Sequence, residues 1–424
     1  MSAALPATLL ASINQDRLWQ RHADMAAHGA IPGPRPDRAG VNRACFTAED
    51  IAARQMLVGW ATARGFEVSQ DAIANLYIRR RGTESSRAPI VTGSHMDTQP
   101  RGGRFDGIYG VLAGFEVLEA LEDAGIATVA PVEVVAWTNE EGGRFAPGTM
   151  GSMVFAGQKS VEAFAEVRDT SGVRFADALA ATLAATPAPI TRPLPGVVGG
   201  YVEAHIEQGP RLEAAGARIG VVTGIQGMRW FEVDITGETA HAGTCPVGQR
   251  RDALRSAHAV VSALYDVTRD PEDTLRFTIG RFLVDPGSPN TVPNRVHFTI
   301  DMRHPDKATL DRLADAIPAT ITAAVAPCTA TVRVTNASAP MVFDQQVVDR
   351  VEAATKALGL PYLVMPSGAG HDAGYVARLA PAGMIFIPCE RGVSHNEAEF
   401  ATPQDLTNGT RVLAATLLAM AGVV

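Results

Sequence analysis

The chain has 424 residues, of which 46% are hydrophobic and 19% are charged, a composition typical of a globular protein rather than a disordered one. Its 37 basic and 45 acidic residues give a net charge of −8, which argues against nucleic acid or an anionic membrane as the main partner, because both favour a basic surface. No apolar run reaches the roughly 18 residues of a membrane-spanning helix, so none is expected.

The cysteines are far apart and form no CxxC pair, which excludes a zinc site built from paired thiolates and indicates a reducing compartment. They are Cys45, Cys245, Cys328 and Cys389. The first residues, MSAALPATLLASINQDR, lack the basic start and the sustained apolar core of a signal peptide. We therefore expect a soluble, cytoplasmic protein.

The first part of the chain alternates between helices and apolar strands. Residues 46–65 predict a helix that Thr47 caps and Gly65 ends. A buried strand, an amphipathic helix and a second strand are expected over residues 88–93, 107–125 and 132–138. This alternation indicates an α/β sheet whose ligands gather at the carboxyl ends of the strands. The Ala/Pro/Gly-rich residues 180–200 are expected to form a surface connection.

From about Gly220 the pattern changes to the alternation of half-exposed antiparallel strands, at residues 230–236 and 296–302. Helices are expected over 252–266 and 308–324, with Pro318 as a possible kink. The first pattern returns after about Asn336, with a helix, a strand and a last helix over residues 345–358, 383–388 and 403–421.

The fold class that follows is an α/β catalytic domain interrupted by a smaller, two-layer α+β unit. We place the discontinuous catalytic domain at residues 1–216 and 335–424, and the inserted domain at residues 217–334.

Polar residues that can bind metal concentrate at the predicted strand ends. Three imidazoles and two or three carboxylates form a ligand set suited to Zn, Mn, Co or Ni. The candidates are His95, Asp106, Glu140, Glu141, His205 and His395. A carboxylate such as Asp106 can bridge two ions, and two ions roughly 3.5–4 Å apart lower the pKa of a shared water toward neutrality.

The adjacent Glu140 and Glu141 point in different directions at a strand end, so one should bind metal while the other accepts and returns a proton. Asp97 follows His95 by two residues and could hold the far ring nitrogen of that histidine. Each residue also has a structural interpretation: a single histidine is commonly a packed or surface residue, and Asp106 could cap a helix at Gly107. The shared position at strand ends favours metal binding.

Several segments together resemble one known family. HMD, GGRFDG, NEEGGRF, EAHIEQG, AHAGTCP, VPNRVHFTIDMR and SHNEAE occur in the order found in the hydantoinase/carbamoylase branch of the dinuclear-metal M20 amidohydrolases. That branch includes N-carbamoyl-L-amino-acid hydrolases, β-ureidopropionases and allantoate amidohydrolases, and the resemblance runs from about residue 10 to the C-terminus.

The resemblance implies two divalent metal ions, with zinc favoured over manganese, cobalt or nickel. It makes Glu140 the general base and the inserted unit a lid and dimerisation domain of a homodimer. The implied metal ligands are His95, Asp106, Glu141, His205 and His395, with Asp106 bridging.

The same comparison implies substrate-binding residues, which the chemistry supports. Arg303 has a planar fork suited to a substrate carboxylate, the alternative being a surface salt bridge. Asn290 could donate to that carboxylate or to the carbonyl, or could cap its own turn. His241 could donate to the oxyanion that forms during hydrolysis, or could be a histidine packed by glycines. Gln208 could bind the ureido amide, and Gly370 would let the backbone approach the ligand closely.

These expectations describe a metal-dependent hydrolase that cleaves the carbamoyl C–N bond of an N-carbamoyl amino acid, a small molecule, and releases ammonia and carbon dioxide. The alternatives are an allantoate amidohydrolase and, with less support, an N-acyl amino acid or peptide hydrolase. A non-catalytic scaffold is disfavoured because the base and all five ligands are present.

Overall fold

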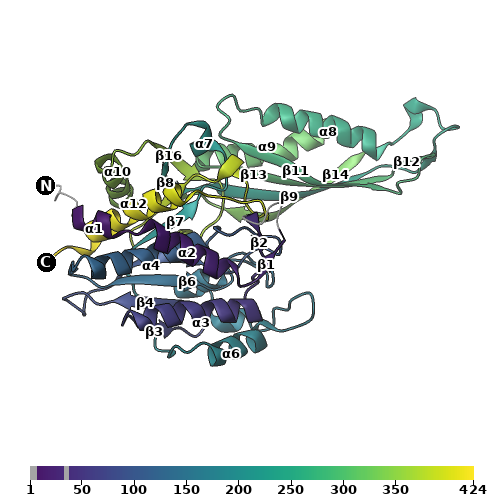
Figure 1. The fold of residues 1–424 in the computed structure, drawn as a ribbon. Coiled ribbons are helices and arrows are strands. Elements are labelled where there is room, and N and C mark those ends of the chain that lie inside the picture. Colours follow the sequence, from purple (N-terminus) through teal and green to yellow (C-terminus); the bar gives the residue numbers. More distant parts are fainter. Residues whose placement is uncertain (1–6, 33–37) are drawn as a thin grey trace. The chain divides into compact units, whose positions relative to one another are not determined.

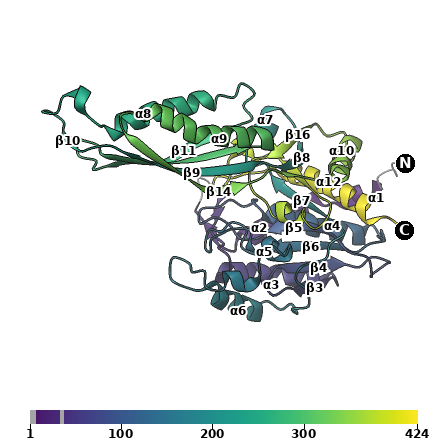
Figure 2. The same cartoon turned by 180° about the vertical axis from the view of Figure 1, so that it is seen from behind.

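The structure is a computed structural model that describes residues 7–32 and 38–424. The chain divides into two compact units, drawn in Figures 1 and 2. The smaller unit covers Gly224–Val342, and the larger one comprises the rest. The expected boundaries, after residues 216 and 334, fall earlier than these. The first would assign β8 (Ile219–Ile225) to the inserted domain, whereas β8 pairs with β17 (Ala382–Ile387) in the sheet of the larger unit.

The larger unit is built on a sheet of nine strands among the described residues, in the order β15-β8-β17-β7-β5-β6-β4-β3 with β16 beside β8. Only the short edge strand β15 and the last two residues of β8 fall within the residue range of the smaller unit. The central strands β17, β7, β5 and β6 are parallel, so their carboxyl ends lie at the same edge. The bounds are β3 (Glu67–Gln70), β4 (Leu76–Arg80), β5 (Ile90–His95), β6 (Val132–Trp137), β7 (Gly200–Ile206), β15 (Met341–Val342) and β16 (Tyr362–Ser367). The short strands β1 (Ala30–Ile31) and β2 (Gly40–Val41) pair separately.

Helices cover both faces of this sheet. One face carries α3, α4, α10 and α12, and α4 lies close because Gly110 and Gly114 face β5, β6 and β7 without a side chain between them. The opposite face carries α5, whose Phe155 packs on Trp137 at 5.0 Å between ring centroids. The bounds are α1 (Ala7–Ser12), α2 (Gln15–Ala26), α3 (Ala48–Ala63), α4 (Ile108–Asp123), α5 (Met150–Phe155), α6 (Phe175–Ala185), α7 (Arg211–Ala214), α10 (Gln345–Ala357), α11 (Ala373–Val376) and α12 (Pro403–Ala421).

The predicted helices and strands of this unit occur at their expected positions. The side chain of Thr47 accepts a hydrogen bond from the backbone of Asp50, as expected of the cap of α3. The expected surface connection over 180–200 is partly wrong, because α6 continues to Ala185. Its Ala- and Leu-rich sequence favours a helix, and Pro187 follows the end of α6.

The smaller unit is a four-stranded antiparallel sheet with two helices on one face (Figures 1 and 2). The strand order is β11-β13-β9-β14, and alternate residues of β9 and β13 pack against α8 and α9 to form a separate hydrophobic core. The helix α9 runs through Pro318 without a break. The bounds are β9 (Gly227–Thr236), β10 (Ala240–His241), α8 (Ala253–Val267), β11 (Arg276–Asp285), β12 (Thr291–Val292), β13 (Arg295–His304), α9 (Lys307–Ala324) and β14 (Thr329–Ser338).

Within the residues described, no helix has both the length and the apolar character needed to cross a membrane. Residues 1–6, which begin the segment expected not to be a signal peptide, lie outside the described residues. The four cysteines are all free thiols.

Candidate metal centre

The carboxylate of Asp106 lies between two groups of possible metal ligands in the larger unit. Its Oδ1 is 3.2 Å from Nε2 of His205 and 4.0 Å from Nε2 of His95. Its Oδ2 is 3.2 Å from Nε2 of His395, which lies 3.4 Å from Oε2 of Glu141. The two oxygens of one carboxylate therefore face two different sets of donor atoms.

These separations fit divalent metal ions. A tetrahedral ion with bonds of about 2.0–2.1 Å to nitrogen and oxygen holds its ligand atoms roughly 3.3 Å apart. Donor atoms within 4.8 Å of one another form two groups that share Asp106: one with His95 and His205, the other with Glu141 and His395. The donor set of imidazoles and carboxylates, with a shared carboxylate, is suited to two ions rather than one.

The fold itself positions the first group. His95 is the last residue of β5 and His205 the sixth of β7, and these two strands pair in parallel. Gly107 leaves space for the ring of His95, because a Cβ there would lie 2.2 Å from that ring and its φ is +66°. The helix α4 begins after Gly107 without a side-chain cap, so the alternative in which Asp106 caps this helix is wrong.

Asp97 contacts His95 through its backbone carbonyl rather than through its carboxylate, unlike the expectation from the sequence. The ring nitrogen Nδ1 of His95 contacts the backbone carbonyl of Asp97 at 2.9 Å, whereas the nearest carboxylate oxygen of Asp97 is 3.9 Å away. The carboxylate instead accepts hydrogen bonds from the backbone N–H groups of Glu140 and Glu141, each at 3.2 Å. Asp97 therefore connects the loop after β5 with the loop after β6.

Glu140 lies beside the two ligand groups without belonging to either. Its Oε2 is 3.6 Å from Nε2 of His95. Burial, followed by the charges of Asp372 and Glu141, raises the pKa of Glu140 well above its ordinary value. A carboxyl group placed next to the donor atoms but outside both groups is suited to proton transfer.

The electrostatics of the cluster favour added positive charge. Burial and the charge of Asp106 raise the pKa of Glu141 to about 8, and burial and the charge of Asp50 raise that of Asp97 to about 7. Burial lowers the pKa of His205, but its hydrogen bond with Asp106 and the charges of Asp106 and Glu203 together outweigh burial and raise this pKa to about 9. The buried carboxyl groups thus repel one another when no cation lies between them.

Two further predicted residues lie in this unit. Nε2 of Gln208 donates to Oδ2 of Asp106 at 3.0 Å, and the backbone of Gln208 has a φ of +56°. Gly370 is exposed, and a Cβ added there would meet no atom within 4 Å. Its neighbour His371 packs against the ring of His205 at 4.7 Å between centroids.

His241 and Asn290 lie together in the smaller unit. His241 is in β10 and pairs with Thr291 of β12, and the carbonyl of Asn290 accepts a hydrogen bond from Ala242 at 3.0 Å. Nδ1 of His241 accepts from the backbone of Gly243, and Oδ1 of Asn290 accepts from Ser288. Both predicted side chains are exposed at one end of this unit.

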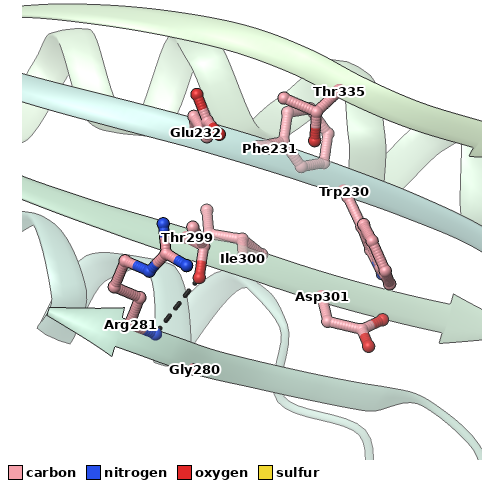
Figure 3. A pocket seen from close by; sticks show the side chains of 9 residues that line it. All are labelled: Trp230, Phe231, Glu232, Gly280, Arg281, Thr299, Ile300, Asp301 and Thr335. Atoms are coloured by element: carbon pink, nitrogen blue, oxygen red, sulfur yellow. Dashed lines mark hydrogen bonds between the residues drawn. The ribbon is translucent and has the colours of Figure 1, made fainter. Parts of the chain in front are cut away.

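Arg303 lies near the other end of β13, on the sheet face that carries no helix. Its guanidinium pairs with the carboxylate of Asp301 through Nε at 3.0 Å and Nη2 at 2.8 Å, so a salt bridge is present at this position. Asp301 and Trp230 are paired across the strands β13 and β9 and line a hollow of about 400 Å³ on this face (Figure 3). None of the metal-ligand candidates around Asp106 lines this hollow.

Sequence reasoning missed two polar residues that contact this centre. The hydroxyl of Ser394 lies 3.1 Å from Oδ2 of Asp106 and 2.9 Å from Oε2 of Glu399, and Glu399 is fully buried. Both belong to the segment that carries His395. The signal available was the number of acidic residues after His395, but nothing in the sequence separates buried Glu399 from Glu397, which pairs with the exposed Arg101.

Comparison with known proteins places the chain in a family. The model of peptidase family M20/M25/M40 matches residues 91–419. The N-carbamoyl-L-amino acid amidohydrolase of Geobacillus stearothermophilus is 38% identical over 406 residues, which are 95% of this chain and 97% of that relative. The ureidoglycolate hydrolase of Oryza sativa subsp. japonica is 32% identical over 417 residues, 96% of this chain and 84% of that relative.

A solved structure gives the same assignment. The amidase of the hydantoinase/carbamoylase family from Burkholderia multivorans matches with a TM-score of 0.89 and 42% identity, over 96% of this chain and 98% of that one. The resemblance drawn from the sequence motifs is therefore confirmed, and the chain belongs to the peptidase family M20/M25/M40.

Proposed function

We propose that this chain hydrolyses the carbamoyl C–N bond of an N-carbamoyl amino acid to give the amino acid, ammonia and carbon dioxide. The observation that carries the proposal is the position of Asp106 between two groups of metal-ligand candidates with Glu140 alongside. The names of the relatives, several of which are N-carbamoyl-L-amino-acid amidohydrolases, support the carbamoyl group as the target.

The proposed ligands are His95, Asp106, Glu141, His205 and His395, and zinc is the proposed ion, with manganese, cobalt and nickel as alternatives for the same donors. When bound, two such ions supply an acidified water and polarise the carbamoyl carbonyl. Glu140 accepts the proton of the attacking water and then delivers it to the leaving nitrogen. Its position outside both ligand groups supports this role.

The remaining predicted residues bind the substrate in this proposal. Arg303 receives the substrate carboxylate with its fork, and Asn290 donates to that carboxylate or to the carbonyl. His241 donates to the oxyanion, and Gln208 binds the ureido amide. The open space at Gly370 lets the ligand approach the backbone.

We further propose a homodimer in which the partner contributes part of this set. His241 and Asn290 lie beyond the start of β13, whereas Arg303 lies near its end, so they are separated by about eight residue steps, or about 26 Å. One small substrate does not span that distance, so a single copy cannot supply all three groups to one site. The edge strand β11, with exposed Phe282 and Leu283, offers a surface for a second copy.

Substrate binding would then close the smaller unit over the metal centre. The four free thiols support a reducing compartment, and we propose the cytoplasm as the location.

A second candidate is a ureide substrate such as allantoate, which is favoured by the similarity to the rice ureidoglycolate hydrolase. Both reactions use the same ligands and base, so residues outside the centre decide between them.

The test is hydrolysis of a panel of substrates by the purified, zinc-loaded chain: N-carbamoyl-α-amino acids, 3-ureidopropionate, allantoate and N-acetyl amino acids. Ammonia release follows the ureido substrates, and release of the free amino group follows the N-acetyl amino acids. We expect the highest kcat/KM with an N-carbamoyl amino acid. The highest value with allantoate would replace the first candidate by the second, and turnover of N-acetyl amino acids alone would refute both. The Glu140→Gln variant controls for contaminating amidases.

A further inference from the structure

Glu399 connects two segments that carry metal-ligand candidates. Its side chain is 0% exposed, and its Oε1 accepts hydrogen bonds from the backbone N–H groups of Phe105 at 2.9 Å and Asp106 at 3.0 Å. Its Oε2 lies 2.9 Å from the hydroxyl of Ser394, the residue before His395. One carboxylate thus fixes the backbone of the shared ligand and the segment of another ligand.

Ser394 extends this connection to the donor atoms. Its hydroxyl lies 3.1 Å from Oδ2 of Asp106, and it accepts a hydrogen bond from Nε2 of Gln208 at 3.2 Å. Because the hydroxyl has a single proton, it donates either to Asp106 or to Glu399. Glu399 therefore acts on Asp106 through the backbone, and the two carboxylates share the hydroxyl of Ser394.

The sequence around Asp106 is adapted to Glu399. A Cβ at Gly103 would lie 2.0 Å from the carboxyl carbon of Glu399, so a larger residue at that position would displace the carboxyl group. Gly103, in the GGRFDG segment, thus leaves the space in which the carboxylate of Glu399 reaches the backbone of Phe105 and Asp106. A buried carboxylate that accepts two backbone hydrogen bonds and contacts a serine hydroxyl, and for which the neighbouring chain leaves room, is a built feature rather than a chance contact.

We propose that Glu399 is a positioning residue, which holds Asp106 so that its two oxygens face separate metal ions. It binds no metal and contacts no substrate. The proposal rests on the metal centre proposed above. Outer groups of this kind set metal affinity through ligand orientation, and their loss typically lowers the affinity about 10–100-fold.

The experiment measures zinc binding to the full-length, metal-free protein by competition with a chromophoric chelator. We expect Glu399→Ala to raise the zinc Kd of at least one site about 10–100-fold. Glu399→Gln should recover most of the affinity, because its amide oxygen still accepts from both backbone N–H groups while its amide nitrogen can donate to Ser394. Glu397→Gln is the matched control from the same segment and should bind zinc like the wild type, because Glu397 pairs with the exposed Arg101.

Thermal melting of each metal-free variant separates a general loss of folding from a loss of ligand geometry. If Glu399→Ala does not fold, Ser394→Ala provides the test, and it should also bind zinc more weakly than the wild type. A Glu399→Ala protein that folds and binds zinc with the wild-type Kd would overturn the positioning role, and so would an equal loss in Glu397→Gln. A wild-type protein that binds no divalent ion would instead refute the metal centre itself.

Discussion

Replacing Glu140 with glutamine separates proton transfer from metal binding. The variant keeps the number of side-chain heavy atoms but cannot accept a proton. Glu140 belongs to neither group of donor atoms around Asp106, although its Oε2 lies 3.6 Å from Nε2 of His95. We therefore expect Glu140→Gln to retain both metal ions.

The expected loss of activity follows from the role of a general base. Such a group contributes typically about 10²–10⁴-fold to the rate, which corresponds to about 2.7–5.4 kcal/mol of barrier at about 1.36 kcal/mol per factor of ten. Glu141→Gln is the matched comparison from the next position. Since Oε2 of Glu141 lies 3.4 Å from Nε2 of His395 within a ligand group, that variant should lose metal as well as activity.

The assay combines two measurements on the same preparations: ammonia release at saturating substrate, and metal content after gel filtration. The assignment predicts that Glu140→Gln loses kcat by at least about 10²-fold with unchanged metal content. Undiminished kcat would remove Glu140 as the base. Loss of metal from Glu140→Gln but not from Glu141→Gln would exchange the two roles.

Three further perturbations test the site and the fold. Arg303→Lys should raise KM for carboxylate-bearing substrates about tenfold or more, because the point charge of lysine cannot reproduce the two parallel hydrogen bonds of a guanidinium. Arg333→Lys on the same sheet is the control. An unchanged KM would show that Arg303 does not bind the substrate carboxylate. Dialysis against a chelator should abolish ammonia release, and restoration of activity by Zn, Mn, Co or Ni identifies the ions that support catalysis. Full activity in the metal-free protein would contradict the mechanism. Burial lowers the pKa of His22 to about 3, so the unfolded chain takes up this proton first as pH falls below the ordinary value of 6.5. The wild type should therefore lose about 2–3 kcal/mol of unfolding free energy between pH 7 and pH 4.5 through this residue, and the unfolding free energy of His22→Gln in urea should depend less on pH.

The main secondary structure could be predicted because its signals are local. Thr47 precedes an acidic first turn, and the helix it caps begins where expected. The apolar run before His95 forms a strand that is buried along its whole length. The boundaries of the inserted unit could not be read so closely, because β8 has strand character in either unit and its partner β17 lies about 160 residues away.

The contacts within the site depend on such distant pairings, and there the sequence was less informative. The two-residue spacing of His95 and Asp97 predicted a contact between their side chains. In the structure, the ring of His95 contacts the backbone carbonyl of Asp97, and the carboxylate of Asp97 accepts a hydrogen bond from the backbone N–H of Glu140. Glu399 was not assigned at all, because its partners Phe105 and Asp106 lie almost 300 residues earlier.

Several buried acidic residues at and beside the proposed metal centre conflict with stable folding. Burial and mutual repulsion raise the pKa values of Glu140, Glu141, Asp97 and Asp372, so the metal-free fold keeps these groups at a cost in free energy. A fold selected for stability alone would not place four acidic groups together without compensating charge. Divalent cations held at Asp106 would remove that repulsion, so the same binding event would stabilise the chain and supply its chemistry.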